Sequence, residues 1–380
     1  MLLSFYIHII LLISFAIFSV VTLTFIKRIY TENNLLSSTP PASIRDTQIE
    51  FRSLANGTNK SPSNASVARN DESDLRENIF GSAKAKNSIL DRLTFINPPN
   101  TVCIYPDNTE NYMIIIVLSR ALNFDFRQAI RATWGGNEKY KGYNTIMKTI
   151  FFVGTDDSVQ LAVRLEQARF NDVIEIVIPE NYAFVAHKEL ASLLWTRLYC
   201  PLARIVFRAD DDILMDTFSL LNFIKHDLNL NVNDGLYGWF RFNNSVHRGD
   251  RWAVTRMEYK PNTYPPYTFG VGYLFSNSSC QRLLNAANQP NHQIVRIGDA
   301  YITGILRDLA GIPFYDFHDL EFSYTFHDQL PCDEYFMDNP RLLLCMSKLH
   351  LGIREDLFEF YDTWDIILSK HNTSLSDAFY

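Results

Sequence analysis

The chain has 380 residues, of which 47% are hydrophobic, and a formal net charge of −7. This composition provides enough apolar residues for a sizeable core and excludes wholesale disorder. The acidic balance offers no basic surface of the kind that nucleic-acid-binding proteins use, so we expect no nucleic-acid partner. An acidic protein still binds a nucleotide diphosphate when a metal ion lies between the two sets of negative charge.

The N-terminal segment is strongly apolar, with no Lys, Arg, Asp or Glu between Leu2 and Ile26. A helix of this length crosses a hydrocarbon layer of about 30 Å. The alternative is a cleaved signal peptide, but no positive charge precedes the run and no clear small-residue cleavage site follows it. We therefore predict a transmembrane signal-anchor over residues 1–29, although Lys27 and Arg28 argue against a lumenal C-terminal side under the positive-inside rule.

Residues 30–100 are rich in Ser, Asn, Thr and charged residues, which predicts a flexible stem. Six Asn-X-Ser/Thr sequons indicate glycosylation in a secretory compartment, with chance occurrence in an Asn/Ser-rich chain as the alternative; they begin at Asn56, Asn59, Asn64, Asn243, Asn277 and Asn372. The five cysteines lack CxxC spacing, which makes a zinc site unfavourable. They fit an oxidising compartment with up to two disulfides and one free thiol, of undetermined pairing.

Residues 101–380 read as one folded domain. Buried-strand patterns are typical of parallel sheets, and they occur at Tyr112–Leu118, Thr149–Val153, Val173–Ile178 and Arg204–Phe207. Helical patterns lie between them, the clearest at Glu189–Leu198. This alternation predicts an α/β domain with a mostly parallel central sheet, whose ligands bind beyond the carboxyl ends of the strands.

Three adjacent carboxylates, Asp210, Asp211 and Asp212, directly follow the last of these strands. Such a group repels itself without a counter-ion, and oxygen ligands at a strand end suit Mg²⁺ or Mn²⁺, which then binds the phosphates of a nucleotide. The alternative is a solvated acidic turn in which Asp212 or Asp216 caps the next helix.

Three further patterns are weak when taken singly. Arg127 and Arg131 share a helix face, which suits holding a phosphate, ordering an acidic loop or simple exposure. The aromatic, Pro- and Gly-rich stretch Tyr264–Tyr273 fits either sugar binding or a tight turn into a buried strand. Asp299, inside an apolar stretch, is either a general base or a helix cap.

Together these patterns resemble glycosyltransferase family 31, the β-1,3-galactosyltransferase and β-1,3-N-acetylglucosaminyltransferase family, across about residues 112–365. The similar stretches include RQAIRATWG at Arg127–Gly135, FFVGT at Phe151–Thr155, WTRLYCPLARIVFRADDD at Trp195–Asp212, RWAVTRMEYKPNTYPPYTFGVGY at Arg251–Tyr273 and GDAYITG at Gly298–Gly304. Leu165-Glu166 and Asn171–Ile174 lie between them in the family's order.

The resemblance implies a Rossmann-like nucleotide-sugar transferase fold of the GT-A type with one site for Mn²⁺ or another divalent cation. It implies that Asp210 and Asp211 contribute to nucleotide binding, that Asp212 coordinates the metal and that His350 is a second ligand. Arg127, Arg131 and Lys188 would lie near the donor, and Asp299 would be the catalytic base.

The implied reaction is inverting transfer of galactose from UDP-galactose, with UDP-N-acetylglucosamine as the alternative donor, to the 3-hydroxyl of a glycan on protein or lipid. The implied location is the Golgi membrane, in type II orientation with the catalytic domain in the lumen. A catalytically silent glycan-binding protein or transferase chaperone, and more remotely a metal-dependent phosphohydrolase, are the competing functions.

The chain departs from the family pattern at three places. The family's acidic motif carries two adjacent carboxylates, and here the first position is Gly298. The stretch Tyr182–Lys188 keeps its Tyr and Lys but lacks the usual Asn and Thr, and Arg208 stands where Lys is common. These differences bear on catalytic geometry, acceptor and donor identity.

Overall fold

The computed structural model describes residues 72–80, 88–96, 103, 112–136, 140, 146–228, 234–250, 252–290, 292–326, 330–347 and 357–371. All of them belong to one compact unit, Asn70–Tyr380. The predicted anchor over residues 1–29 and the predicted ligand His350 lie outside the described residues. Among the described helices, none has the length and apolar character needed to cross a bilayer.

An eight-stranded sheet in the order β1-β4-β3-β2-β5-β8-β7-β9 forms the centre of the fold. Its strands are β1 (Phe95–Ile96), β2 (Tyr112–Leu118), β3 (Ile146–Thr155), β4 (Val173–Pro179), β5 (Ile205–Asp210), β7 (Leu236–Arg241), β8 (Tyr267–Ser276) and β9 (Phe314–Asp316). A second sheet joins β10 (Ser323–Phe326), β11 (Leu342–Met346) and β6 (Ile213–Met215).

The first four predicted strands all form, and they lie side by side as the parallel block β4-β3-β2-β5. From β5 onwards the sheet is mixed, because β8 pairs antiparallel with both β5 and β7. The α/β class is confirmed, and the parallel arrangement is confined to one half of the sheet together with the β7–β9 pair. The antiparallel half was hidden in the sequence because its strands lack the continuous apolar runs of the parallel ones.

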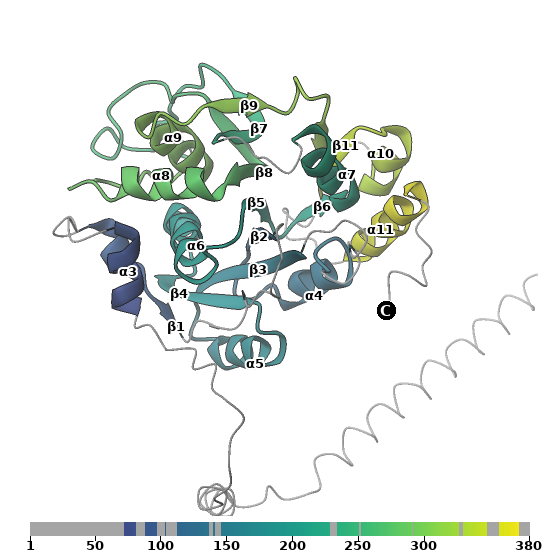
Figure 1. Ribbon diagram of the computed structural model, residues 1–380, viewed down its shortest axis with the longest axis horizontal. Coiled ribbons are helices and arrows are strands. Elements are labelled where there is room, and N and C mark those ends of the chain that lie inside the picture. Colours follow the sequence, from purple (N-terminus) through teal and green to yellow (C-terminus); the bar gives the residue numbers. More distant parts are fainter. Residues whose placement is uncertain are drawn as a thin grey trace, which may run out of the picture. The chain divides into compact units, whose positions relative to one another are not determined.

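Both faces of the sheet are buried, which explains the continuous apolar sequence of β2. One face packs on α6 (Val185–Tyr199), α8 (Asn277–Ala287) and the π-helix η6 (Ala300–Leu306). The opposite face packs on α4 (Phe124–Ala132), α5 (Gln160–Phe170), α7 (Thr217–Asn222) and α11 (Phe358–Lys370), together with the small sheet (Figure 1). Residues of β2 alternate between these two hydrophobic clusters, as side chains on a strand must.

The elements not yet named are α3 (Glu72–Phe80), η2 (Ile89–Arg92), η4 (Tyr182–Phe184), η5 (Phe223–Asp227), α9 (Arg307–Leu309) and α10 (Cys332–Asp338).

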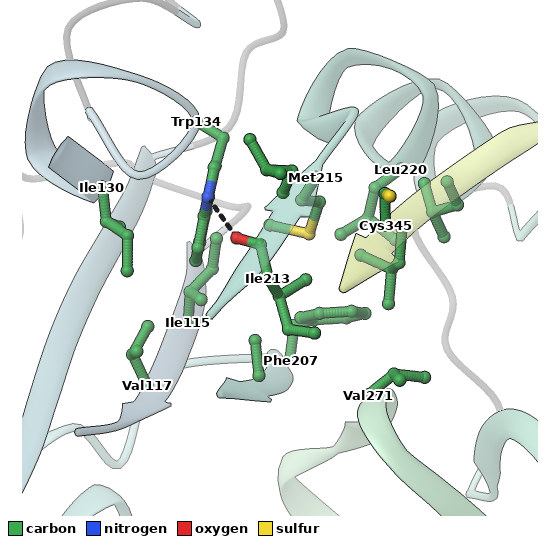
Figure 2. Close-up of a cluster of buried hydrophobic side chains, with 14 of the residues drawn as sticks. Ile115, Val117, Ile130, Trp134, Phe207, Ile213, Met215, Leu220, Val271 and Cys345 are labelled. Carbon is green, nitrogen blue, oxygen red and sulfur yellow. Dashed lines mark hydrogen bonds between the residues drawn. The ribbon is translucent and has the colours of Figure 1, made fainter. Parts of the chain in front are cut away.

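Trp134 ties α4 to the segment that follows the acidic triplet. Its ring is buried, and its indole N–H donates to the carbonyl of Ile213 on β6 at 2.8 Å (Figure 2). Figure 2 shows Trp134 among side chains from β2, α4, β5, β6, α7, β8 and β11. Trp134 is therefore a core residue that fixes the path of the chain after Asp212.

The folded unit begins before residue 101, the expected start of the catalytic domain. Apolar residues of α3 pack on the face covered by α6, and β1 pairs with β4. The buried Arg76 of α3 donates to the carbonyls of Leu90 and Leu93 at 2.8 and 2.7 Å. The polar composition of residues 30–100 as a whole concealed these short apolar segments near its end.

Two disulfides join Cys103 to Cys200 and Cys332 to Cys345, and Cys280 is a buried free thiol. The prediction of up to two disulfides and one free cysteine is confirmed, and the structure supplies the pairing that spacing left open.

Candidate active site

The acidic triplet lies at the carboxyl edge of the parallel block. Asp210 is the last residue of β5 and is paired in register with Leu118, the last residue of β2. β3 and β4 run parallel to β2, so their carboxyl ends meet at the same edge. This edge is where open α/β sheets bind their ligands.

Asp211 turns back toward the loop after β2. Its Oδ2 accepts hydrogen bonds from the Ser119 hydroxyl at 2.7 Å and from the Asn123 amide at 3.0 Å. Burial raises the pKa of Asp211, and these hydrogen bonds oppose that rise. Asp211 therefore joins two strand ends rather than presenting both oxygens to a ligand.

Asp212 has the clearest capacity to bind a cation. Its Oδ1 is buried without a hydrogen-bond partner among the described residues, while its backbone carbonyl accepts from the Ser347 amide at 2.9 Å. Burial, Asp210 and Asp211 raise the pKa of Asp212. A buried carboxylate oxygen without a donor beside two other carboxylates fits a hard divalent cation. The described residues contain no group of three His, Cys, Asp or Glu side chains placed to hold a metal.

The proposed cap role belongs to Asp216 instead. Asp216 accepts from the Ser219 amide at 2.9 Å and so caps α7, and it also contacts Lys370 and His371 at the end of α11. Asp212 makes no such cap.

Arg127 is fully buried and organises the loop that carries Ser119. It donates to the Ser119 hydroxyl at 2.9 Å and to the carbonyls of Arg120 and Ala121 at 2.7 and 3.2 Å, and it pairs with Glu166 at 2.6 Å. Of the roles open to it, ordering the loop next to the acidic triplet is the one these contacts display.

Arg131 extends the same network away from the triplet. It pairs with Glu166 at 2.8 Å and Asp172 at 2.7 Å, and its guanidinium lies over the rings of Phe151 and Phe170. These four charged side chains, Arg127, Arg131, Glu166 and Asp172, connect three stretches that are separate in the sequence. The stretches are Arg127–Gly135, Leu165-Glu166 and Asn171–Ile174.

Lys188 is buried at the start of α6. It donates to the Ser119 carbonyl at 2.8 Å and to Glu180 at 2.6 Å. Glu180, which the sequence analysis did not single out, also accepts from the backbone amides of Ala121 and Gly154 at 3.1 and 2.8 Å. Burial lowers the pKa of Lys188 despite its carboxylate partner. The ion pair between Lys188 and Glu180 connects the carboxyl ends of β2, β3 and β4.

Asp299 lies beside Gly270 of β8, whose carbonyl accepts from Arg208. It is half-buried at the start of η6, where its Oδ1 accepts from the Ala300 amide at 2.8 Å, so it does act as a helix cap. A Cβ placed on Gly270 of β8 would lie 3.5 Å from its Oδ2. Burial raises the pKa of Asp299, Arg208 opposes that rise and Asp210 adds to it. Asp299 and the end of β5 therefore share one electrostatic environment.

Arg208 contacts groups on three of the elements that surround this site. It pairs with Asp210 at 2.8 Å, lies 3.3 Å from Glu189 and donates to the Gly270 carbonyl at 2.5 Å. Although burial lowers the pKa of Arg208, Asp210 and Glu189 raise it overall. Arg208 and Glu189 were not among the predicted site residues, because one lies inside a strand pattern and the other inside a helix pattern.

The structure shows the turn into a buried strand for Tyr264–Tyr273, and sugar binding by its tyrosines stays a prediction. Tyr273 is buried within β8, as a turn into a buried strand predicts. Tyr264 stacks on Tyr259 with ring centroids 5.3 Å apart, and the Tyr267 hydroxyl accepts from the Asn244 amide at 3.0 Å. The electrostatic influence of Asp299 reaches both Tyr264 and Tyr267.

The domain is thus an open α/β sheet with charged residues gathered at the carboxyl edge of its parallel strands. The sequence model of the galactosyltransferase family matches residues 125–318, and the chain belongs to this family. A UDP-GalNAc:beta-1,3-N-acetylgalactosaminyltransferase 1 of Mus musculus is 27% identical over 226 residues, covering 57% of this chain and 66% of the relative. The chain therefore spans just under two thirds of that protein.

Two further relatives are named for the transfer of other sugars. A human lactosylceramide 1,3-N-acetyl-beta-D-glucosaminyltransferase is 28% identical over 215 residues, covering 53% of this chain and 54% of the relative. A beta-1,3-galactosyltransferase 5 of Pan paniscus is 25% identical over 229 residues, covering 59% and 72%. Relatives that transfer three different sugars match the chain to a similar degree, so these similarities do not select a donor.

Proposed function

We propose that the chain is an inverting β-1,3-glycosyltransferase of the GT-A type that transfers a hexose from a UDP-sugar to a glycan on protein or lipid. One observation supports this most directly. Arg208 pairs with Asp210 at 2.8 Å and donates to the carbonyl of Gly270, which lies beside Asp299, at the carboxyl edge of the sheet of a galactosyltransferase-family domain. We assign UDP-galactose as donor, with UDP-N-acetylglucosamine as the alternative.

The donor is assigned to the edge formed by Asp210, Asp211 and Asp212. Asp212, through its unpartnered oxygen, and His350 would hold Mn²⁺ or a similar cation. When bound, the cation supplies Lewis-acid stabilisation of the departing diphosphate. Arg127 and Lys188 act near the donor by fixing the loop through Ser119, and Arg131 supports Arg127 through their shared partner Glu166.

The assigned base is Asp299. It takes the proton from the acceptor 3-hydroxyl, the oxygen forms a bond to the anomeric carbon, and the bond from that carbon to the diphosphate oxygen breaks with its electron pair leaving on UDP. Burial raises the pKa of Asp299, which makes its carboxylate a stronger proton acceptor. The predicted anchor over residues 1–29 and the two disulfides are consistent with the proposed lumenal Golgi domain in type II orientation.

The test is UDP release by the purified full-length chain with Mn²⁺, a panel of β-glycosides and each of UDP-galactose, UDP-N-acetylglucosamine and UDP-N-acetylgalactosamine. Acceptor-dependent release with one donor, lost on chelation and in Asp212→Asn, supports the proposal and names the donor. Asp365→Asn, an exposed carboxylate on α11, is the matched control and should behave as the native chain. A folded chain that binds no UDP with Mn²⁺ contradicts the assignment and favours a silent relative.

A further inference from the structure

Gly298 occupies a position where no larger residue fits beside the present neighbours. A Cβ at this position would overlap with Oε2 of Glu189, and it would lie 3.5 Å from Cγ1 of Val185 and 3.6 Å from the Cα of Ala186. The nearest obstacle is thus the carboxylate of a helix α6 residue, while the other two contacts are ordinary. The glycine immediately before Asp299 makes room for a charged group supplied from elsewhere in the chain.

Glu189 is completely buried, which is costly for a carboxylate. Its Oε1 accepts a hydrogen bond from the Tyr273 hydroxyl and lies 3.3 Å from Nε of Arg208. Its Oε2 has no hydrogen-bond partner among the described residues. Arg208 is the cation that this carboxylate faces, so the geometry pairs Glu189 with that arginine.

Arg208 connects Glu189 to both sides of the site. One guanidinium nitrogen pairs with Asp210 on β5 at 2.8 Å, and another donates to the carbonyl of Gly270 on β8 at 2.5 Å. Gly270 in turn lies against Asp299. A shift of the Glu189 carboxylate would therefore move the arginine that spaces Asp210 from Asp299.

We infer that Glu189 supplies, from α6 and in the space left by Gly298, the second carboxylate beside Asp299, and that it acts as a positioning residue through Arg208. This inference rests on the proposed transfer reaction. In this arrangement Gly298 is a consequence of moving the carboxylate to another element and does not signify a lost activity.

The test relocates the carboxylate in the full-length chain. Five variants are compared with the native protein: Glu189→Gln, Glu189→Ala, Gly298→Ala, Glu189→Ala/Gly298→Ala and Glu189→Ala/Gly298→Glu. Each is measured for kcat and KM of UDP release, for UDP affinity in Mn²⁺ and for the midpoint of thermal unfolding. The Ala/Ala variant is the control for the relocation variant, since both remove Glu189 and fill position 298.

We expect Glu189→Gln to lower kcat about 10- to 100-fold with UDP affinity unchanged, as loss of a group that orients the reacting residues does. The Glu189→Ala/Gly298→Glu variant should exceed the Ala/Ala control in kcat by about tenfold. Gly298→Ala should unfold at a lower temperature than the native chain, and much of that loss should vanish when Glu189→Ala is present.

Native kcat in Glu189→Gln overturns the inference, as does a folded, UDP-binding relocation variant no faster than its control. A native chain that releases no UDP contradicts the proposed function instead. In that case the thermal cycle still decides the structural part: additive effects of Gly298→Ala and Glu189→Ala would show that the two positions do not compete for space.

Discussion

Arg127→Met removes a guanidinium that has no exposed surface and four acceptor groups: the Glu166 carboxylate, the Ser119 hydroxyl and the carbonyls of Arg120 and Ala121. Removing one partner of a buried ion pair costs about 3–5 kcal/mol. Arg131 still contacts Glu166 at 2.8 Å, so the remaining carboxylate is not left without a cation. We therefore expect a loss of about 3 kcal/mol, the low end of that range.

A loss of that size lowers the thermal midpoint of a domain this large by about 5 °C. The assay is thermal and urea unfolding of Arg127→Met, with Arg164→Met as the control because Arg164 is exposed on α5. The control should change stability by less than about 0.5 kcal/mol. Native stability in Arg127→Met together with weaker UDP binding would refute the reasoning, since it would make Arg127 a donor contact rather than the support of the Ser119 loop.

Asp299→Asn should lower UDP release about 100-fold or more while leaving UDP affinity and the unfolding midpoint unchanged, and an equal loss of UDP affinity would contradict its role as base. Cys332→Ala/Cys345→Ala opens a loop with a sequence separation of 13 and should cost about 3 kcal/mol in urea unfolding, so a loss under about 1 kcal/mol would count against the disulfide. Burial raises the pKa of Asp216, but His371 and Lys370 lower it overall from 3.8. A depressed pKa contributes stability that is present above 3.8 and lost as pH falls below it, so the native chain should lose stability in this acid range more steeply than Asp216→Asn, and parallel pH curves would contradict this.

The parallel half of the sheet was predictable because a strand buried on both faces leaves a continuous apolar signature, as in Tyr112–Leu118. The placement of Asp210 at the carboxyl edge followed from its position after such a strand. β8 was less visible, since its glycines and tyrosines interrupt any simple pattern. Its antiparallel position next to β5 depends on contacts between residues more than 60 positions apart, such as that between Arg208 and Gly270.

The site was predictable where charged residues stood out from their surroundings and not where they were part of a regular pattern. Asp299 attracted notice inside an apolar stretch, whereas Glu189 read as an ordinary polar residue at the start of an amphipathic helix. Its burial could be found only from the packing of α6 on β8. Glu180 and Ser119 were missed for a related reason, because each is a common loop residue whose significance comes from the partners that the fold brings to it.

The double-sided burial of β2 has a consequence for how the chain finds its fold. A strand that is apolar on both faces loses little hydrophobic contact when it slips by one residue, so its alternation does not specify its pairing. The groups that distinguish the correct alignment lie just after the end of β2. There the Ser119 hydroxyl donates to Asp211, and the Ser119 carbonyl accepts from Lys188. A slipped strand would leave these charges buried and unmatched. The polar contacts at the carboxyl edge of the sheet would thus also favour the correct alignment of β2 over a slipped one.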